Sequence, residues 1–232
     1  MENAIEFKTK LGDGSEPKKG FFKQLLAAGG RWMTGESLFL THFKNIGTQN
    51  SSVGFAAPYP GTIIPVNLPQ HGGGSIICQK DAFLCAALGT KVSIHFNRRL
   101  GSGLFGGEGF ILQKIQGPSM AFIHAGGTVI EKELHGDTIR LDTGCLVAFS
   151  EGIQYDIQFV KGLTSIIFGN EGLFLATLSG HGTVWIQSLP FSRMADRIIR
   201  ASRGNQGEGT ALTGPLGGIL GGDQSTGFGI SL

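Results

Sequence analysis

Histidine and cysteine side chains are the groups in this chain that could bind a metal ion, and their spacing argues against it. The six histidines are His42, His71, His95, His124, His135 and His181. None of them falls in an H-x-H, H-x-x-x-H or H-E-x-x-H pattern, which would place two ligands side by side. Only His135 and Asp137 are close together, at a predicted surface turn that offers no third ligand. Cys78, Cys85 and Cys145 form no C-x-x-C pair, so reduced thiols and no bound metal or cofactor are expected.

Two glutamates at equivalent places in glycine-rich turns could carry out acid–base chemistry. They are Glu108 and Glu171, and Glu36 is a possible third. Duplication explains this equivalence more simply, since a carboxylate in such a turn accepts hydrogen bonds from exposed backbone N–H groups. The repeat-equivalent turn residues are Gly106, Glu108, Gly109, Gly169, Glu171 and Gly172. No G-x-S-x-G or local nucleophile signature occurs, so no catalytic residue is predicted, although a triad assembled in space stays open.

The glycine loop 101–107 superficially suits phosphate binding. A phosphate-binding loop needs a strand before it and a helix after it, so that the helix N-terminus meets the phosphate. Residues 110–115 instead have the pattern of a strand, and no Lys-Ser or Lys-Thr follows the loop. We therefore interpret it as a turn.

Basic residues gather at one place, near the end of the chain. The candidate ligand-binding residues are Arg193, Arg197, Arg200 and Arg203, with Arg98 and Arg99 as a smaller pair. The chain as a whole carries a net charge of only +2, which excludes a strong overall basic field for nucleic acid or membranes. A solvated helix face is the simpler interpretation of these arginines, and a nucleic-acid or anionic-ligand site is the alternative.

Composition indicates a folded β-rich protein. Of 232 residues, 41% are hydrophobic and 16% charged, the reverse of a disordered chain. The 39 glycines have no collagen period and separate short apolar runs, as in a protein with many tight turns. The stretch 1–20 is polar and charged and no apolar run could span a bilayer, so no membrane span and a cytoplasmic location are expected.

Self-similarity along the chain predicts tandem units. Residues 105–112 recur at 168–175, and further matches join 83–86 to 145–148 and 61–64 to 127–130. The predicted organisation is an incomplete first unit at 1–60, whose opening strands are missing, and full units at 61–123 and 124–187. Within the full units, apolar residues alternate with polar ones at 92–96, 145–149 and 155–159, which is typical of strands with one buried face. Gly136-Asp137 is among the predicted turns between strands.

Two segments depart from the strand pattern. Residues 21–28 predict a short helix that Gly29-Gly30 ends, and residues 190–203 predict a longer one within a C-terminal segment at 188–203. Pro190 suits the first turn of that helix and Gly204 its end. Residues 204–232 are glycine-rich and are expected to be a tail packed on the body.

Four sequence stretches give the chain a family resemblance. They are Ala56 to Gly61, Leu104 to Phe110, Asp142 to Phe149 and Val184 to Pro190. With them the chain resembles the bacterial relatives of the yeast mitochondrial protein called altered inheritance of mitochondria twenty-four. The resemblance implies an all-β fold of three tandem units, each a β-sandwich or short double-stranded β-helix similar to the tryptophan RNA-binding attenuation protein. It also implies a homotrimeric ring and no enzyme activity. Where the family tends to have Gly-Pro-Gly, this chain has Gly180-His181-Gly182, which places His181 at a predicted turn.

The sequence thus leaves three hypotheses for function. The first is a non-enzymatic, ring-forming assembly or interaction protein with an unknown protein partner. The second is a nucleic-acid or anionic-ligand binder that uses the arginine face at 193–203. The third is an enzyme with a site at a subunit interface, which would require several histidines or the repeated glutamates to converge in space.

Overall fold

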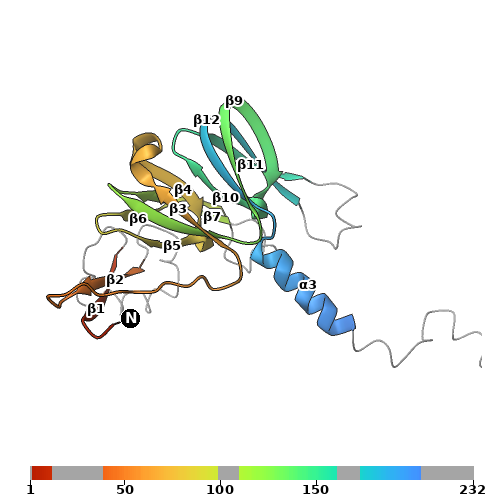
Figure 1. The fold of residues 1–232 in the computed structure, drawn as a ribbon. Coiled ribbons are helices and arrows are strands. Elements are labelled where there is room, and N and C mark those ends of the chain that lie inside the picture. Colours follow the sequence, from red (N-terminus) through yellow and green to blue (C-terminus); the bar gives the residue numbers. More distant parts are fainter. Residues whose placement is uncertain (1, 12–38, 99–109, 161–172, 205–232) are drawn as a thin grey trace, which may run out of the picture. The chain divides into compact units, whose positions relative to one another are not determined.

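The structure is a computed structural model that describes residues 2–11, 39–98, 110–160 and 173–204. The predicted helix at 21–28, the turn residues at 106–109 and 169–172, and the tail from 205 onward lie outside these ranges. The described part is built mainly from antiparallel strands, which agrees with the all-β prediction (Figure 1). No helix in these ranges is long and apolar enough to cross a bilayer.

The described ranges contain twelve strands, and an α-helix follows the last of them. The strands are β1 (Ile5–Leu11), β2 (Phe39–Asn45), β3 (Thr62–Asn67), β4 (Ser75–Gln79), β5 (Phe83–Ala86), β6 (Lys91–Arg98), β7 (Phe110–Gln116), β8 (Met120–Ala125), β9 (Val129–Asp142), β10 (Leu146–Ser150), β11 (Gln154–Val160) and β12 (Leu173–Gln187). The helix is α3 (Phe191–Gly204). The alternating patterns at 92–96 and 155–159 fall on β6 and β11, and most of 145–149 falls on β10, so strands at these places and the C-terminal helix, α3, are confirmed. The prediction of one buried face is wrong for β10, because all five of its residues are buried between neighbouring elements.

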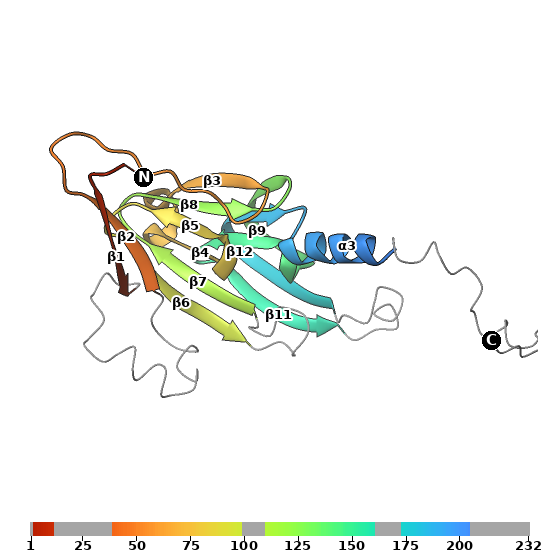
Figure 2. The same ribbon diagram turned by 90° about the horizontal axis from the view of Figure 1, so that it is seen from below.

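The strands form three sheets. The largest has the order β11-β12-β10-β4-β7-β6, with β9 also paired to β12. A second sheet has the order β3-β8-β5, and β1 pairs with β2 in a third. The largest sheet joins strands far apart in sequence, because β4 pairs with β10. Figure 2 shows the strands of the two larger sheets running past one another in layers.

Two hydrophobic clusters form the core of the described part. The first includes residues of both larger sheets, whereas the second has none from the β3-β8-β5 sheet. One contains fully buried residues of β4, β8 and β10 together with Trp185. The other surrounds Phe149, which is 0% exposed, and includes residues of β9, β11 and β12. On β8 alternate positions face the first cluster, namely Ala121, Ile123 and Ala125. On β10 the adjacent Val147 and Ala148 both belong to it, beside the register shift between Leu146 and Ala148.

The turns predicted at Gly136-Asp137 and at Gly180-His181-Gly182 are wrong, because both places lie inside long strands. β9 continues through Gly136, and β12 continues through Gly180 and Gly182. All three glycines have positive φ angles, which L residues with side chains adopt only with strain. They accommodate a register shift between Ser179 and His181, so the two strands bend and keep pairing.

The described contacts divide the chain into two compact units, Met1–Ser192 and Arg193–Leu232. The first contains all the strands that the structure describes, and the second begins within α3. The finer boundaries at 60, 123 and 187 stay predictions.

Candidate functional site

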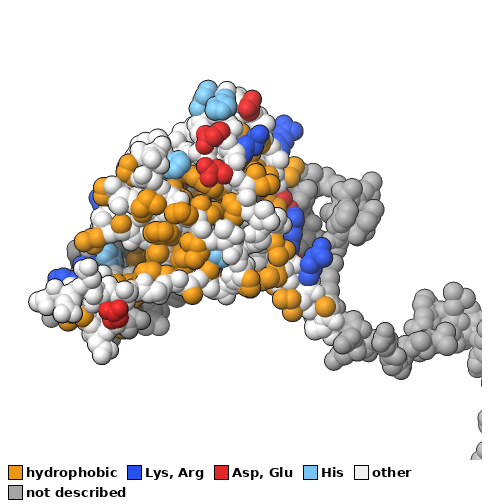
Figure 3. Space-filling view, viewed as in Figure 1, with side chains coloured by type: hydrophobic (Ala, Val, Ile, Leu, Met, Phe, Trp, Pro, Cys, Tyr) orange, Lys and Arg blue, Asp and Glu red, His pale blue; other side chains and the backbone are white. Residues whose placement is uncertain are grey.

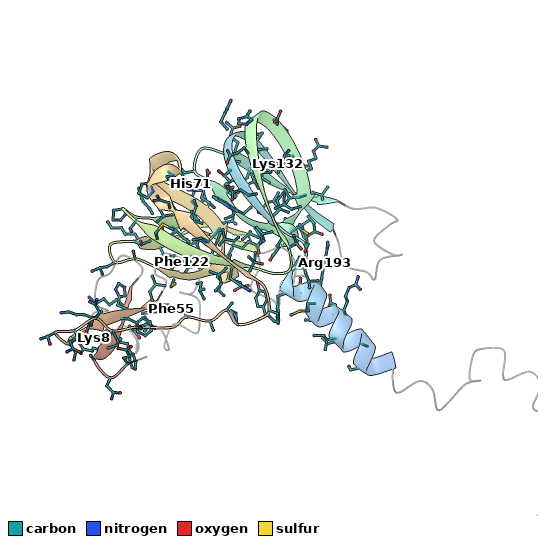
Figure 4. All side chains as sticks on the ribbon, in the orientation of Figure 1. Lys8, Phe55, His71, Phe122, Lys132 and Arg193 are labelled. Atoms are coloured by element: carbon teal, nitrogen blue, oxygen red, sulfur yellow. The ribbon has the colours of Figure 1, made fainter. Side chains whose placement is uncertain are left out.

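The arginines predicted as a ligand-binding face belong to helix α3. Arg193 and Arg197 are exposed, and Figure 4 labels Arg193. The side chains of Arg200 and Arg203 are outside the described part. Asp196 lies one turn from Arg193 and reduces the positive charge of this stretch, while Ile198 is 61% exposed. The helix therefore presents basic and apolar groups together.

The histidines are distributed over several places in the fold. His135 and His181 lie directly opposite one another on β9 and β12. The Nδ1 atom of His71 lies 3.3 Å from the Ser150 hydroxyl oxygen, and His95 lies near Tyr155, with ring centroids 6.0 Å apart. No group of three or more His, Cys, Asp or Glu side chains in the described ranges could hold a metal ion. Cys78 and Cys85 are reduced thiols, and burial raises the pKa of both.

The most connected polar group centres on Glu151, directly after β10. Lys114 Nζ, on β7, donates to Glu151 Oε1 at 2.5 Å, and the Ser75 hydroxyl donates to Glu151 Oε2. The backbone N–H of Glu151 donates to the Ser75 carbonyl at 3.4 Å. Gly73 packs against the same carboxylate, because a Cβ there would lie 3.0 Å from Oε2. We call Glu151, Lys114 and Ser75 the Glu151 cluster.

Neighbouring polar and charged groups determine the ionisation of Glu151 and of the nearby His95. Hydrogen bonds from Lys114 and then Ser75 lower the pKa of Glu151, against a smaller opposing effect of burial. Burial and the Lys114 charge lower the pKa of the nearby His95. At neutral pH the cluster is therefore a closed ion pair beside a histidine whose charged form is disfavoured.

The Glu151 cluster has the chemistry of a structural clamp. Lys114 is already neutralised by Glu151, so the pair offers neither a free cation for an anionic ligand nor an unpaired base. Its three members come from the start of β4, the middle of β7 and the end of β10, so it joins β4 to the two strands that flank it in the sheet. Sequence reasoning missed it because the contacts span 76 and 37 residues, and no local motif marks them.

Replacing Glu151 by Gln should lower the free energy of unfolding by roughly 0.5–1 kcal/mol at pH 7, since the pair is partly exposed. A carboxylate with a lowered folded-state pKa stabilises the fold above its ordinary pKa of 4.5, and this contribution is lost as pH falls below that value. The difference between wild type and Glu151→Gln should therefore shrink below about pH 4.5, as measured by urea unfolding.

The matched control is Glu6→Gln. Glu6 forms a 3.3 Å ion pair with Lys8 in which both side chains are more exposed than those of the Glu151 pair. Its loss should change stability less at every pH. Equal effects of the two substitutions would contradict the clamp.

A second unusual group is His124 on β8. This residue is 2% exposed, and neither ring nitrogen has a hydrogen-bond partner among the described residues. Tyr59 packs edge-on against it, with ring centroids 4.5 Å apart, and the Tyr59 ring lies 4.9 Å from that of Phe191. Burial lowers the pKa of His124. His124 is therefore a buried, aromatic-packed histidine beneath the half-buried Tyr59.

The described strands pair in antiparallel sheets, so the fold is all-β with a C-terminal helix. A family model described as "AIM24: Mitochondrial biogenesis AIM24" matches residues 1–189. The chain belongs to this family, as the resemblance in the four sequence stretches predicted.

Two similar proteins come from Streptococcus pyogenes. An uncharacterized protein of serotype M6 is 30% identical over 199 residues, which is 84% of this chain and 75% of that protein. A crystal structure of another Streptococcus pyogenes protein superposes with a TM-score of 0.62 at 23% identity, covering 86% of this chain and 83% of that one. The second similarity shows that the fold is shared.

Proposed function

We propose that this chain is a non-enzymatic assembly protein, built from tandem β units, whose copies form a closed homotrimeric ring that holds a protein partner. One observation carries the proposal. A set of strand pairings within residues 61–123 has a counterpart within residues 124–187 that keeps the same register and the same irregularity.

The pairing of β5 with β8 matches the pairing of β10 with β12. The opposed residues are Phe83–Ile123 and Cys85–Phe122 in the first pair of strands, and Leu146–Ile186 and Ala148–Trp185 in the second. Each residue of the first set maps onto one of the second by the same offset in number, as from 83 to 146 and from 122 to 185. Both pairs also shift register at the same point. Since a bulge is a position-specific feature that related structures keep, its recurrence supports duplicated units.

Parts of two further pairings correspond by the same offset, although the register shift of β6 and β7 between Ile94 and Phe96 has no counterpart in β11 and β12. The opposed residues are Gln79–Leu112 and Val92–Ile115 in the first set, and Asp142–Leu175 and Tyr155–Leu178 in the second. Each unit on its own leaves strand edges open, and stacking units edge to edge covers them. Copies of the chain can continue this stacking, and closed symmetry ends it without a free edge. The number three rests on the family resemblance.

Light scattering on a size-exclusion peak, with the nucleic-acid absorbance ratio of the same peak, tests the proposal. At micromolar concentration we expect three times the 24.5 kDa chain mass and the absorbance of protein alone. A monomer mass would refute the ring.

A nucleic-acid or anionic-ligand binder is the second candidate, because Arg193 and Arg197 are both exposed. Replacing Arg193, Arg197 and Arg200 by Ala should then abolish binding of single-stranded nucleic acid at low salt and flatten its salt dependence. The matched control replaces three exposed lysines, Lys8, Lys44 and Lys132, and should leave binding largely intact. Absence of binding by the wild type would remove this candidate.

A further inference from the structure

The two proposed units meet inside the chain through one short ladder, between β4 and β10. The opposed residues are Cys78–Ala148, Ile77–Phe149 and Ile76–Ser150. All six are buried, none more than 3% exposed. The Glu151 cluster closes the end of this ladder. We call it the internal junction.

Each strand of the internal junction has a counterpart in the other unit that lacks the corresponding partner. The counterpart of β10 is β5 with Ala87, and the counterpart of β4 is the segment of β9 that contains Ile139, Arg140 and Leu141. Among the described residues, β5 pairs only with β8, and β9 pairs only with β12. We call these two unpaired sides the β5 edge and the β9 edge.

Burial at the two edges is incomplete where the internal junction is fully closed. Cys85, Ala86 and Ala87 on the β5 edge are half-buried, although their counterparts on β10 are buried. Ile139 and Leu141 are half-buried members at the margin of one hydrophobic cluster, and Arg140 is exposed. An open edge with small or apolar side chains is suited to another strand.

We propose that the β5 edge of one copy pairs with the β9 edge of a second copy, in the register of the internal junction. The opposed residues between the two copies are Cys85–Leu141, Ala86–Arg140 and Ala87–Ile139. This deepens the proposed ring and rests on it. Each copy carries one edge of each kind, so the contact is head-to-tail and repeats from copy to copy until the ring closes.

The side chains agree with this register. In the internal junction Cys78 and Ala148 face one hydrophobic cluster, and Ile77 and Phe149 face the other. The counterparts of the first pair, Leu141 and Cys85, therefore share one face of the new ladder. Arg140 takes the opposite face, where its charged end reaches solvent past the small side chain of Ala86.

A cysteine cross-link reports this register directly. Residues directly opposite in an antiparallel pair have Cα atoms about 4.5–5.5 Å apart, within the range that a disulfide spans. The natural Cys85 supplies one thiol, so Leu141→Cys supplies the other. Under mild oxidation this variant should give covalent dimers and trimers on non-reducing gels that disappear on reduction.

Two matched variants test whether the link is specific. Leu141→Cys combined with Cys85→Ser should lose the ladder of bands, although Cys78 and Cys145 are still present. Arg140→Cys, one position away, points to the other face and should cross-link at least tenfold more slowly. Similar cross-linking by Leu141→Cys and Arg140→Cys would overturn the register.

Different experimental results would refute the proposed ring and the proposed contact between the β5 and β9 edges. A trimer mass in which Leu141→Cys forms no link to Cys85 of another chain would leave the ring and overturn the contact. A link within one chain, or protection of the β5 edge by residues 12–38 of the same copy, would also overturn it. A monomer mass for wild type would overturn both.

Discussion

Replacing Trp185 by Ala should lower the free energy of unfolding by about 3–5 kcal/mol, the largest loss expected from a single substitution here. Trp185 is 2% exposed, and its ring centroid lies 5.1 Å from that of His71. Its Nε1 donates to Glu131 Oε2 at 3.1 Å, so truncation leaves both a cavity and a carboxylate without this donor. Denaturant unfolding at fixed protein concentration measures the loss.

Phe122→Ala is the matched control, because Phe122 is the repeat counterpart of Trp185 and opposes Cys85 as Trp185 opposes Ala148. Phe122, labelled in Figure 4, is only half-buried. Its truncation removes less buried area and should cost about 1–2 kcal/mol. Equal losses of stability in the two variants would contradict the claim that Trp185 contributes more to the core than Phe122 does.

Gly61→Ala should be the second most damaging change, by roughly 1–3 kcal/mol. A Cβ at Gly61 would overlap the backbone carbonyl of Ala125 and the Nε2 atom of His124. Ala125 belongs to β8, which pairs with β3 directly after Gly61, so its backbone cannot move aside without breaking that ladder. Thermal unfolding of the variant should therefore begin at a lower temperature than that of wild type.

Gly54→Ala supplies the comparison. A Cβ at Gly54 meets no atom within 4 Å, and its φ is not in the left-handed region. The substitution should be neutral or slightly stabilising, because alanine reduces the freedom of the unfolded chain. Equal losses at both glycines would show that the close approach at Gly61 is not the cause.

Local patterns predicted the strands and helix, since side-chain alternation acts over a few residues. The run Val92, Ile94 and Phe96 falls on β6, and Tyr155, Ile157 and Phe159 fall on β11. Pro190 directly precedes α3 and Gly204 is its last residue. These signals depend only on periodicity and on the backbone limits of proline and glycine.

The same glycine rule failed at Gly136 and Gly180. Glycine marks a positive φ angle but does not say whether the chain reverses there or keeps pairing. In this fold β9 and β12 support each other along their length, so pairing continues through the irregularity. His181 consequently lies opposite His135 across the two strands.

The Glu151 cluster was beyond local reasoning. Glu151 meets Ser75 and Lys114 only after β4 has paired with both β7 and β10. The exposed surface also groups residues that are far apart in the sequence. Figure 3 shows hydrophobic side chains spread over the central strands, and charged or histidine side chains near the bend of β9 and β12. Such groupings depend on topology, which a repeat can indicate only in outline.

We propose that copies of this chain assemble through the β5 edge and the β9 edge, the counterparts of the two strands that pair at the internal junction. Sedimentation equilibrium of the wild-type chain across a concentration series tests this most directly. The account predicts a single species of three times 24.5 kDa that persists below micromolar concentration. A single species of 24.5 kDa at every concentration would contradict it.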